Sequence, residues 1–302
     1  MLGLSRPDLS VVIPARDAAG LTRLCLGSLI FTLRTFPGTV EVLLIDDAGS
    51  DPQITDMFLD FRRKTKWPTR VFRLHDRGHY TGVFNLALAQ SEGERLFFLS
   101  NDMQVTPSFL TAQLGVLGLS EDIAAVRGTS EYTDSFPNHK VVPPFGSRGF
   151  EDILAFSRYV FEHHGLSYVE DRLFSGDAVL LRRSAWTRLG GFDPRFFGYY
   201  SDFDYGLRAQ KAGFRLVCAK GAWLHHEGAG HIKDESIREQ KSLDYVSARR
   251  NELIQADYLR FREKWDPSLP LEHSGVRFDY NRMRASDVST FIPFSEGAHD
   301  EL

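Results

Sequence analysis

Three short apolar runs in the first third of the chain each end in polar residues that could hold a metal ion or a phosphate group. The runs are residues 9–14, 40–45 and 96–99, and the polar side chains that follow them are Arg16 and Asp17, Asp46 and Asp47, and Asn101 and Asp102. Such runs are typical of strands buried on both faces of a parallel sheet, and ligands of open α/β sheets bind where these strands end. An Asx turn before the next helix is the alternative explanation for Asn101-Asp102. Three polar strand ends together favour a binding edge.

The loops after these runs lack the usual glycine-rich cradles for phosphate. No G-x-G-x-x-G follows the first run, and G-x-x-x-x-G-K-[ST] occurs nowhere in the chain, which disfavours a Rossmann dehydrogenase and a P-loop NTPase. A diphosphate bound at this edge would therefore need a divalent metal ion to neutralise it.

Two carboxylates lie at the expected start of a helix over residues 205–212. Ser201 and Asp204 have the spacing of a capping box, which gives Asp204 a structural role. Asp202 has only the helix dipole to complement, so it is the better candidate for a general base. The dipole lowers the pKa of a carboxyl group at this position, and burial must compensate if Asp202 is to be an effective base.

Two pairs of adjacent histidines occur in the chain. His225 and His226 end an apolar stretch before Glu227, and because neighbours in an extended chain point to opposite sides, at most one of them faces a site. A histidine beside a carboxylate-lined cleft is a candidate metal ligand. His163 and His164 end an expected helix, where cationic side chains complement the dipole.

The composition is that of an ordinary globular protein with a well-buried core. The chain has 302 residues, of which 42% are hydrophobic and 25% charged. Its net charge of −4 gives no electrostatic reason to expect nucleic acid as a partner.

The two cysteines, Cys25 and Cys218, cannot form a disulfide framework, which favours a reducing compartment. No apolar run reaches the roughly 18 residues of a membrane span, and residues 1–9 do not resemble a signal peptide. The sequence thus predicts a cytoplasmic protein.

Strand and helix patterns alternate through the first hundred residues, which predicts βαβ units and a parallel sheet with right-handed crossovers. The expected strands are residues 9–14, 40–45, 71–74, 96–99, 174–181 and 214–219, and the expected helices are residues 21–33, 53–64, 82–90, 151–163, 182–189 and 205–212.

The C-terminal part has a different character. Residues 234–265 are charged and helical in pattern, and their apolar positions favour docking either on the preceding domain or on a second subunit, as in a homodimer. Residues 268–302 have little periodicity, and we expect them to wrap the surface or to be partly disordered. Residues 129–171 also look long and irregular around their one expected helix.

Taken in order, several blocks of this sequence resemble inverting glycosyltransferases of family 2. The blocks are residues 9–15, Asp46-Asp47-x-Gly49-Ser50, Asn85 within GVFNLALAQSEGE, SNDMQVTPSFL, SGDAVLLRRSAWTRLGGFDPRFF, YYSDFDYGLRAQKAGFRL and AWLHHEGAG. The resemblance covers roughly residues 9–230 and is closest to rhamnosyltransferase-like members that build bacterial surface polysaccharides.

The resemblance implies a GT-A fold, in which helices flank a central, mostly parallel sheet. Residues 1–233 would form the glycosyltransferase domain, with a Rossmann-like nucleotide-sugar-binding half over 1–107 and an acceptor-binding, catalytic half over 108–233. Residues 234–302 would be a helical C-terminal extension.

The resemblance also implies roles for single residues. Pro14, Ala15 and Arg16 would line the pocket for the nucleotide base, and Asp46 would contact the base. Asn101 and Asp102 would be the last two positions of an Asp-x-Asp motif. Asp102 and His226 would bind Mn²⁺ or Mg²⁺, which bridges the donor diphosphate.

Asp202 would be the general base that accepts the proton of the acceptor hydroxyl. We expect the acceptor to bind at Gly176, Asp177, Tyr199 and Tyr200, although the aromatic segment around the two tyrosines could equally fill the core. Ser100 stands where the first Asp of Asp-x-Asp often lies, and Ser201 replaces a usual Glu.

The expected reaction moves a sugar from a nucleotide-diphosphate donor to an acceptor hydroxyl by a single displacement, with inversion. The acceptor could be a glycan, a lipid-linked molecule or a protein, and the protein, which has no transmembrane segment, could still touch the inner face of the membrane. Two other classes stay open. One is a sugar nucleotidyltransferase, although residues 14–20 lack the glycine-rich, Arg- or Lys-ended loop expected of it, and the other is a non-catalytic sugar-binding scaffold.

Overall fold

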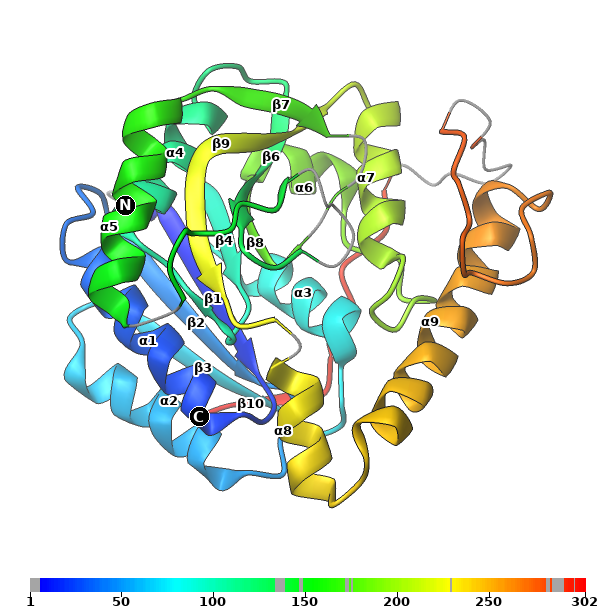
Figure 1. The fold of residues 1–302 in the computed structure, drawn as a ribbon, viewed down its shortest axis with the longest axis horizontal. Helices are drawn as coiled ribbons and strands as arrows, with labels where there is room; N and C mark the ends of the chain where they lie inside the picture. Colours follow the sequence, from blue (N-terminus) through cyan, green and yellow to red (C-terminus); the bar gives the residue numbers. More distant parts are fainter. Residues whose placement is uncertain are drawn as a thin grey trace, which may run out of the picture.

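A computed structural model describes residues 6–133, 139–146, 149–171, 174, 176–228, 230–280, 283, 291–295 and 297–302. Its N-terminal half is a set of parallel strands joined by helices (Figure 1). The elements are β1 (Leu9–Ala15), α1 (Ala19–Leu33), β2 (Val40–Asp46), α2 (Pro52–Lys64), β3 (Thr69–Leu74), α3 (His79–Gln90) and β4 (Arg95–Leu99). β1 pairs with β2 and β4, and β2 pairs with β3, all in parallel. The predicted βαβ arrangement is confirmed.

The second half continues the same sheet in mixed orientation. Its strands are β5 (Met103–Gln104), β6 (Ile123–Ser130), β7 (Tyr168–Asp171), β8 (Ala178–Arg182) and β9 (Arg215–His226). β8 lies antiparallel between β4 and β6, while β6 runs parallel to β9. The order across the sheet is β10-β3-β2-β1-β4-β8-β6-β9-β5, and β7 pairs with β9.

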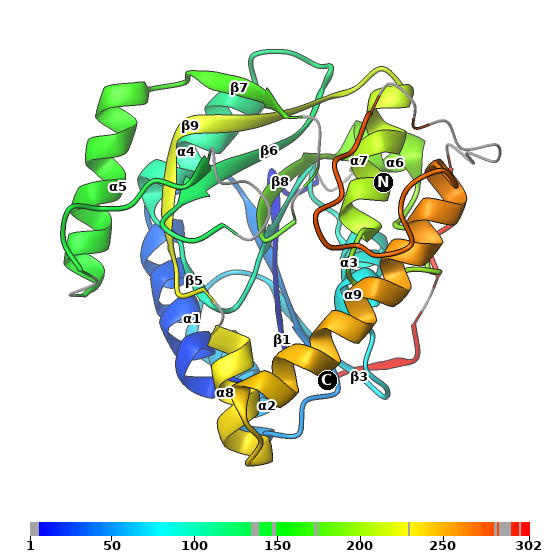
Figure 2. The ribbon, with the colours of Figure 1, turned by 45° about the vertical axis from the view of Figure 1, so that its right-hand side comes forward.

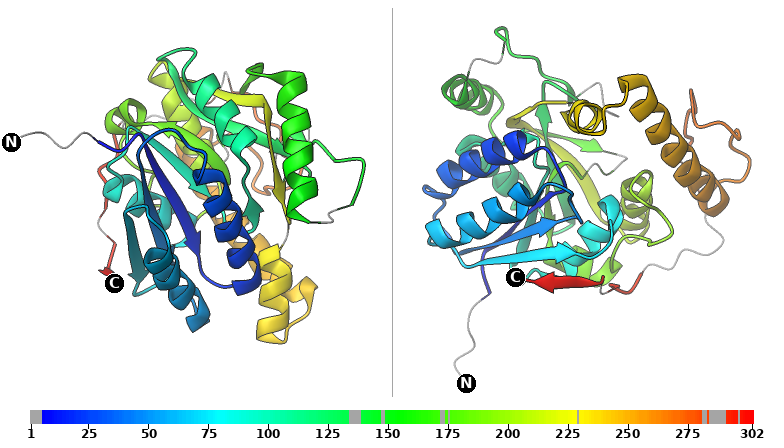
Figure 3. Two further views of the ribbon diagram at one scale, coloured as in Figure 1. Left: turned by 90° about the vertical axis from the view of Figure 1, so that its left-hand side faces the viewer. Right: turned by 90° about the horizontal axis from the view of Figure 1, so that it is seen from below.

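Helices cover both faces of the sheet, as Figure 3 shows from two further sides. Val11 and Ile13 belong to a core cluster with residues of α1, α2 and α4 (Pro107–Leu117), whereas Val12 belongs to a second cluster with residues of α3, α6 (Arg183–Leu189) and α7 (Ser201–Lys211). Alternate residues of one strand thus serve opposite faces, as the pleat requires. α5 (Phe150–His164) packs beside β9.

The C-terminal extension docks on the same chain. After α8 (Gly230–Glu239), the long helix α9 (Leu243–Trp265) crosses one side of the molecule (Figure 2) and buries Tyr258, Phe261 and Trp265 in a cluster with Phe196 and Leu207. β10 (His299–Glu301) adds an antiparallel edge strand to β3. Of the two predicted docking partners, the domain is confirmed. The homodimer and the domain boundary at residue 233 stay predictions.

The expected capping box at α7 is wrong. The helix begins at Ser201, four residues before the predicted start, because Tyr200 adopts a left-handed conformation with φ of 60° and serves as the N-cap. The Ser201 hydroxyl is buried and bonds to none of the described residues. Asp204 is instead fully buried, with its carboxylate 3.0 Å from Arg208 Nε and 2.9 Å from Trp265 Nε1.

Candidate active site

A cleft of about 790 Å³ opens at the carboxyl ends of the parallel strands and is closed on one side by α8 and α9. Most of the residues proposed from the sequence line it: Pro14, Ala15, Arg16, Asn101, Gly176, Asp177, Tyr199, Tyr200, Asp202 and His226. Two of the proposed residues, Asp46 and Asp102, do not belong to the lining. The cleft therefore joins segments from both halves of the chain.

Asp46 and Asp47, the neighbouring aspartates at the end of β2, make different contacts. The carboxylate of Asp46 is fully buried and accepts hydrogen bonds from Gly49 N (2.7 Å), Thr55 Oγ1 (2.5 Å) and Arg73 Nη1 (2.6 Å). It therefore holds the turn after β2, which corrects the expectation that Asp46 faces the base. Asp47 lines the cleft and accepts a hydrogen bond from Gly78 N at 2.6 Å, and burial raises its pKa to about 6.

At the end of β4, strand pairing brings Asp102 and His226 together. Met103 of β5 pairs with His226 of β9, and Glu227 N donates to Asp102 O at 3.1 Å. The His226 Nε2 atom lies 3.4 Å from Asp102 Oδ2. Burial alone would lower the pKa of His226, but its hydrogen bond and charge contact with Asp102 raise that pKa to about 9.

A carboxylate oxygen and an imidazole nitrogen at this spacing are suitable ligands for a divalent cation. The donor set thus fits the metal expected here. His225 points elsewhere, as the alternation of an extended chain predicts: its Nδ1 pairs with Glu131, and its Nε2 lies 3.7 Å from Glu227.

Asn101 contributes less directly. Its amide nitrogen donates to Thr22 Oγ1 at 2.8 Å and to Asp17 O at 3.2 Å, so it ties the end of β4 to the loop after β1. These partners lie 79 and 84 residues earlier in the chain, so the bonds are long-range and do not support the Asx-turn alternative, in which the side-chain oxygen accepts from a nearby backbone amide. Asn101 thus lines the cleft and ties two parts of its wall together.

Asp202 faces the cleft from the first turn of α7. Burial raises its pKa to about 8, and the charge of Asp177 adds to the rise, against one hydrogen bond from Phe203 N at 2.9 Å. Burial therefore outweighs the backbone hydrogen bonds that lower the pKa of Asp202, as an effective base requires.

The aromatic segment before α7 divides between core and cleft. Phe192 and Phe196 are buried in the two core clusters, whereas Tyr199 and Tyr200 line the cleft. Core filling is thus confirmed for Phe192 and Phe196, and acceptor binding by Tyr199 and Tyr200 stays a prediction. Gly176 lies opposite, and a Cβ atom there would be 1.3 Å from the Tyr80 hydroxyl, so only glycine fits.

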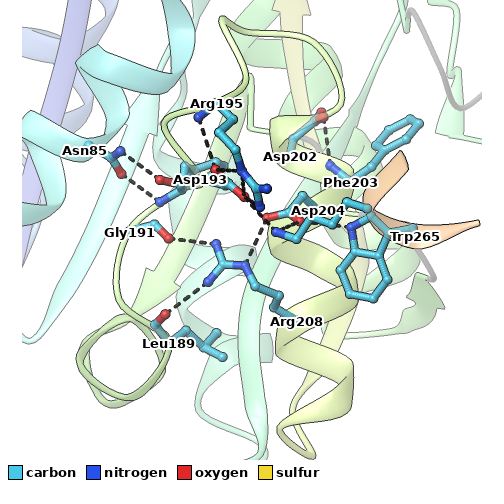
Figure 4. A network of polar contacts seen from close by, with 12 residues as sticks. Asn85, Leu189, Gly191, Asp193, Arg195, Asp202, Phe203, Asp204, Arg208 and Trp265 are labelled. Atoms are coloured by element: carbon cyan, nitrogen blue, oxygen red, sulfur yellow. Dashed lines mark hydrogen bonds and ion pairs between the residues drawn. The ribbon is translucent and has the colours of Figure 1, made fainter. Parts of the chain in front are cut away.

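A buried polar network supports this segment from behind (Figure 4). Asn85 exchanges two hydrogen bonds with Phe192, through its Nδ2 to Phe192 O (2.9 Å) and from Phe192 N to its Oδ1 (2.7 Å). Arg208 donates to the carbonyl oxygens of Leu189 (3.0 Å) and Gly191 (2.6 Å). The network fixes the path of the chain between α6 and α7, and hence the start of the helix that carries Asp202.

Five basic residues of the cleft were missed by the sequence analysis: Arg77, His79, Arg127, Arg249 and Arg250. Burial, Arg16 and Arg249 together lower the pKa of Arg77, so these guanidinium groups are close enough to repel one another. Like charges gathered in a cleft favour an anionic ligand. The adjacent arginines 249 and 250 were visible as a pair, but their place depends on the docking of α9, which local sequence patterns do not report.

Comparisons with known proteins agree with this geometry. The model of the family described as Glycosyl transferase family 2 matches residues 10–185. The O-antigen biosynthesis protein RfbC of Myxococcus xanthus is 29% identical over 260 residues, which is 80% of this chain and 19% of that protein. An N-acetylglucosaminyl-diphospho-decaprenol L-rhamnosyltransferase of Mycobacterium tuberculosis is 48% identical over 61 residues, which is 20% of each protein. Each match therefore covers only about a fifth of the relative's length.

Among solved structures, the mannosyltransferase PcManGT from Pyrobaculum calidifontis, in complex with GDP-Man and Mn²⁺, superposes with a TM-score of 0.54 at 16% identity. The match covers 85% of this chain and 74% of that one. The shared fold is that of GT-A glycosyltransferases, as the sequence resemblance implied. In the described part of the chain, none of the helices has the length and apolar character needed to span a membrane.

Proposed function

The chain belongs to glycosyltransferase family 2, and from this premise we propose that it transfers a sugar from a nucleotide-diphosphate donor to an acceptor hydroxyl, with inversion. One observation carries the proposal. A single cleft holds both the Asp102–His226 pair, through His226, and the buried carboxylate of Asp202. The Asp102–His226 pair would hold the metal ion that neutralises the leaving diphosphate, and Asp202 would accept the proton of the attacking hydroxyl.

The donor would bind at the ends of β1, β2 and β4. Pro14, Ala15 and Arg16 line the base pocket in this proposal, and Asp47 takes the role first expected of Asp46, because Asp47 faces the cleft. Asn101 would shape the same wall.

Asp102 and His226 would hold Mn²⁺ or Mg²⁺. The bound cation would neutralise the negative charge of the departing nucleoside diphosphate. The Pyrobaculum mannosyltransferase, which shares the fold, was crystallised with Mn²⁺.

The acceptor would lie against Gly176, Asp177, Tyr199 and Tyr200, with its hydroxyl facing Asp202. The hydroxyl oxygen attacks the anomeric carbon as the bond from that carbon to the diphosphate oxygen breaks, and Asp202 accepts the hydroxyl proton. Attack from the face opposite the leaving group inverts the anomeric centre, and no covalent intermediate forms.

The relatives favour a place in the synthesis of bacterial surface glycans, with a deoxyhexose such as L-rhamnose as one candidate for the transferred sugar. Of the expected acceptors, a lipid-linked one has the support of a relative named for such a substrate. A cytoplasmic location, with contact at the inner face of the membrane, fits that acceptor and the two buried, unpaired cysteines.

The test is a turnover assay with UDP-, GDP- and TDP-sugars, each with Mn²⁺, Mg²⁺ or EDTA, in the presence of an N-acetylglucosaminyl diphosphate carrying a short prenyl chain. Release of nucleoside diphosphate that requires metal, with a product of inverted anomeric configuration by NMR, supports the proposal. Release of pyrophosphate from a nucleoside triphosphate and a sugar phosphate would indicate a nucleotidyltransferase. Tight binding of sugar nucleotides with no turnover would indicate a scaffold.

A further inference from the structure

Asp257, in the middle of α9, is a fully buried carboxylate with no part in the chemistry described above. It accepts hydrogen bonds from three consecutive backbone amides: Phe197 N at 3.0 Å, Gly198 N at 3.0 Å and Tyr199 N at 3.0 Å. Arg260, one turn further along α9, donates to its other oxygen at 2.8 Å. Through these hydrogen bonds, the C-terminal helix holds the backbone of residues 197–199, which precede α7.

These hydrogen bonds require a carboxylate oxygen at one position on α9. Amide donors bond strongly to a charged carboxylate, and a buried carboxylate without such donors is costly. The segment 197–199 and α9 thus hold each other in place.

The held segment leads directly into the proposed acceptor side. Tyr199 lines the cleft, and its ring lies 5.5 Å from the guanidinium of Arg250 on α9. Tyr200, the next residue, takes the left-handed conformation that starts α7, and Asp202 lies in the first turn. Only two residues separate the last amide held by Asp257 from Asp202.

The helix also supplies part of the cleft wall itself. Arg249, Arg250, Leu253 and Ile254 of α9 line the cleft, facing the same space as Tyr199 and Asp202.

We propose that α9 forms part of the acceptor-binding half of the active site. In this proposal Asp257 is a positioning residue that fixes the positions of Tyr199, Tyr200 and Asp202. The inference rests on the proposed function, since it assigns the acceptor side of that same cleft.

The first test compares Asp257→Asn with Asp193→Asn. Asp193 is a matched control: it is a buried aspartate of the same loop, it is paired with the same helix through Lys264 at 2.8 Å, and it does not line the cleft. The readout is the titration of Asp202 by carboxyl NMR in the unliganded protein, with its signal assigned by loss in Asp202→Asn. Asp257→Asn should lower the Asp202 midpoint by about one unit or more, because a loosened loop admits water to the carboxyl group. Asp193→Asn should leave the midpoint unchanged.

The second test measures kinetics with the sugar nucleotides and the prenyl diphosphate-linked N-acetylglucosamine described above. Asp257→Asn should raise KM for the acceptor about tenfold, while the Kd for nucleotide with Mn²⁺ stays within about twofold of wild type. If Asp257→Asn does not fold, Asp257→Glu, which keeps the charge, takes its place with the same expectations.

An unchanged Asp202 midpoint in the Asp257 variant, or an equal shift in both variants, would overturn the inference. So would a loss of nucleotide affinity with acceptor KM unchanged. If the wild type neither binds nor uses any sugar nucleotide, the proposed function fails, and the titration still decides whether Asp257 positions Asp202.

Discussion

The donor side of the cleft is formed by loops that directly follow β1, β2 and β4, whereas its acceptor side is assembled from segments far apart in the sequence. The residues at these three strand ends have neighbours fixed by parallel pairing, whereas His226, which also belongs to the donor side, comes from the remote strand β9. On the acceptor side, Asp202 depends on a left-handed Tyr200, on the buried network around Asp204, and on α9, more than fifty residues later. The donor side therefore follows mainly from local sequence pattern, and the acceptor side mainly from long-range packing.

The largest expected effect comes from Asp202, on the acceptor side. Asp202→Asn is nearly isosteric, so folding and nucleotide binding should stay intact while kcat falls by about 10²–10⁴, the usual contribution of a positioned general base. Steady-state kinetics and nucleotide calorimetry on the same sample measure both. A wild-type rate of transfer in this variant would remove Asp202 from the mechanism.

Asp204, two residues away, should behave in the opposite manner. Asp204→Asn leaves the buried Arg208 without its carboxylate and takes from Lys264 one of its two, the other being Asp193, and breaking a buried pair in this way costs about 3–5 kcal/mol. Denaturant unfolding should show this loss, which is larger than a helix cap would give. Near-wild-type kcat is expected for the molecules that remain folded, and a catalytically dead but fully stable Asp204 variant would reverse the two assignments.

On the donor side, the two adjacent histidines provide an internal control. His226→Ala should weaken metal-dependent nucleotide binding by about 10–100-fold, as loss of a metal ligand or its orienting partner does. His225→Ala should change it much less, because His225 pairs with Glu131 and Glu227. Titration of the nucleotide with Mn²⁺ into each variant measures the difference, and equal losses would mean that the wrong histidine was chosen.

The raised pKa of Asp202 predicts two pH dependences. Because the base must be ionised, kcat/KM should rise about tenfold per pH unit up to about pH 8 and then level off. The folded state also holds this proton where the unfolded chain has released it, so the group lowers stability as pH rises from about 4 to about 8. Asp202→Asn should therefore become more stable relative to wild type across that interval. A pH-independent difference in unfolding free energy would show that the pKa is not raised.

The smallest effect should separate Asp46 from Asp47. Asp47→Asn should weaken nucleotide binding by about tenfold, since a hydrogen-bonded charge contact contributes on the order of 1.5–3 kcal/mol. Asp46→Asn should mainly lower the melting temperature, because its carboxylate bonds Gly49, Thr55 and Arg73. The reverse pattern would restore the original assignment of Asp46.

The difference between local pattern and long-range packing also explains which parts of the fold could be predicted from the sequence alone. The runs at 9–14, 40–45 and 96–99 predicted their strands because burial on both faces leaves an unbroken apolar signal. β6 was missed because Ala124, Ala125 and Gly128 weaken its strand pattern, and β7 because its four residues are largely exposed. Whether residues 284–290 wrap the surface lies outside the described residues.

The same difference between local pattern and long-range packing decided which site residues could be predicted. Asp102 and Asp202 were singled out from a strand end and a helix start, which are local features, whereas the choice of His226 over His225 came from the family resemblance. Asp204 was misjudged because its spacing from Ser201 imitates a capping box, while its true partners, Arg208, Lys264 and Trp265, are mostly remote. Arg249 and Asp257 could not be placed without knowing where α9 docks, whereas Arg77 follows the end of β3, a local signal that could have found it.

The central claim, a metal-assisted site for a nucleoside diphosphate at the strand ends, is tested most directly by calorimetry of UDP, GDP and TDP with wild type and Asp102→Ala. The account predicts that at least one nucleotide binds wild type about ten times more tightly or better with Mn²⁺ than with EDTA, and that Asp102→Ala abolishes this difference. Identical affinities with Mn²⁺ and with EDTA in the wild type would contradict it.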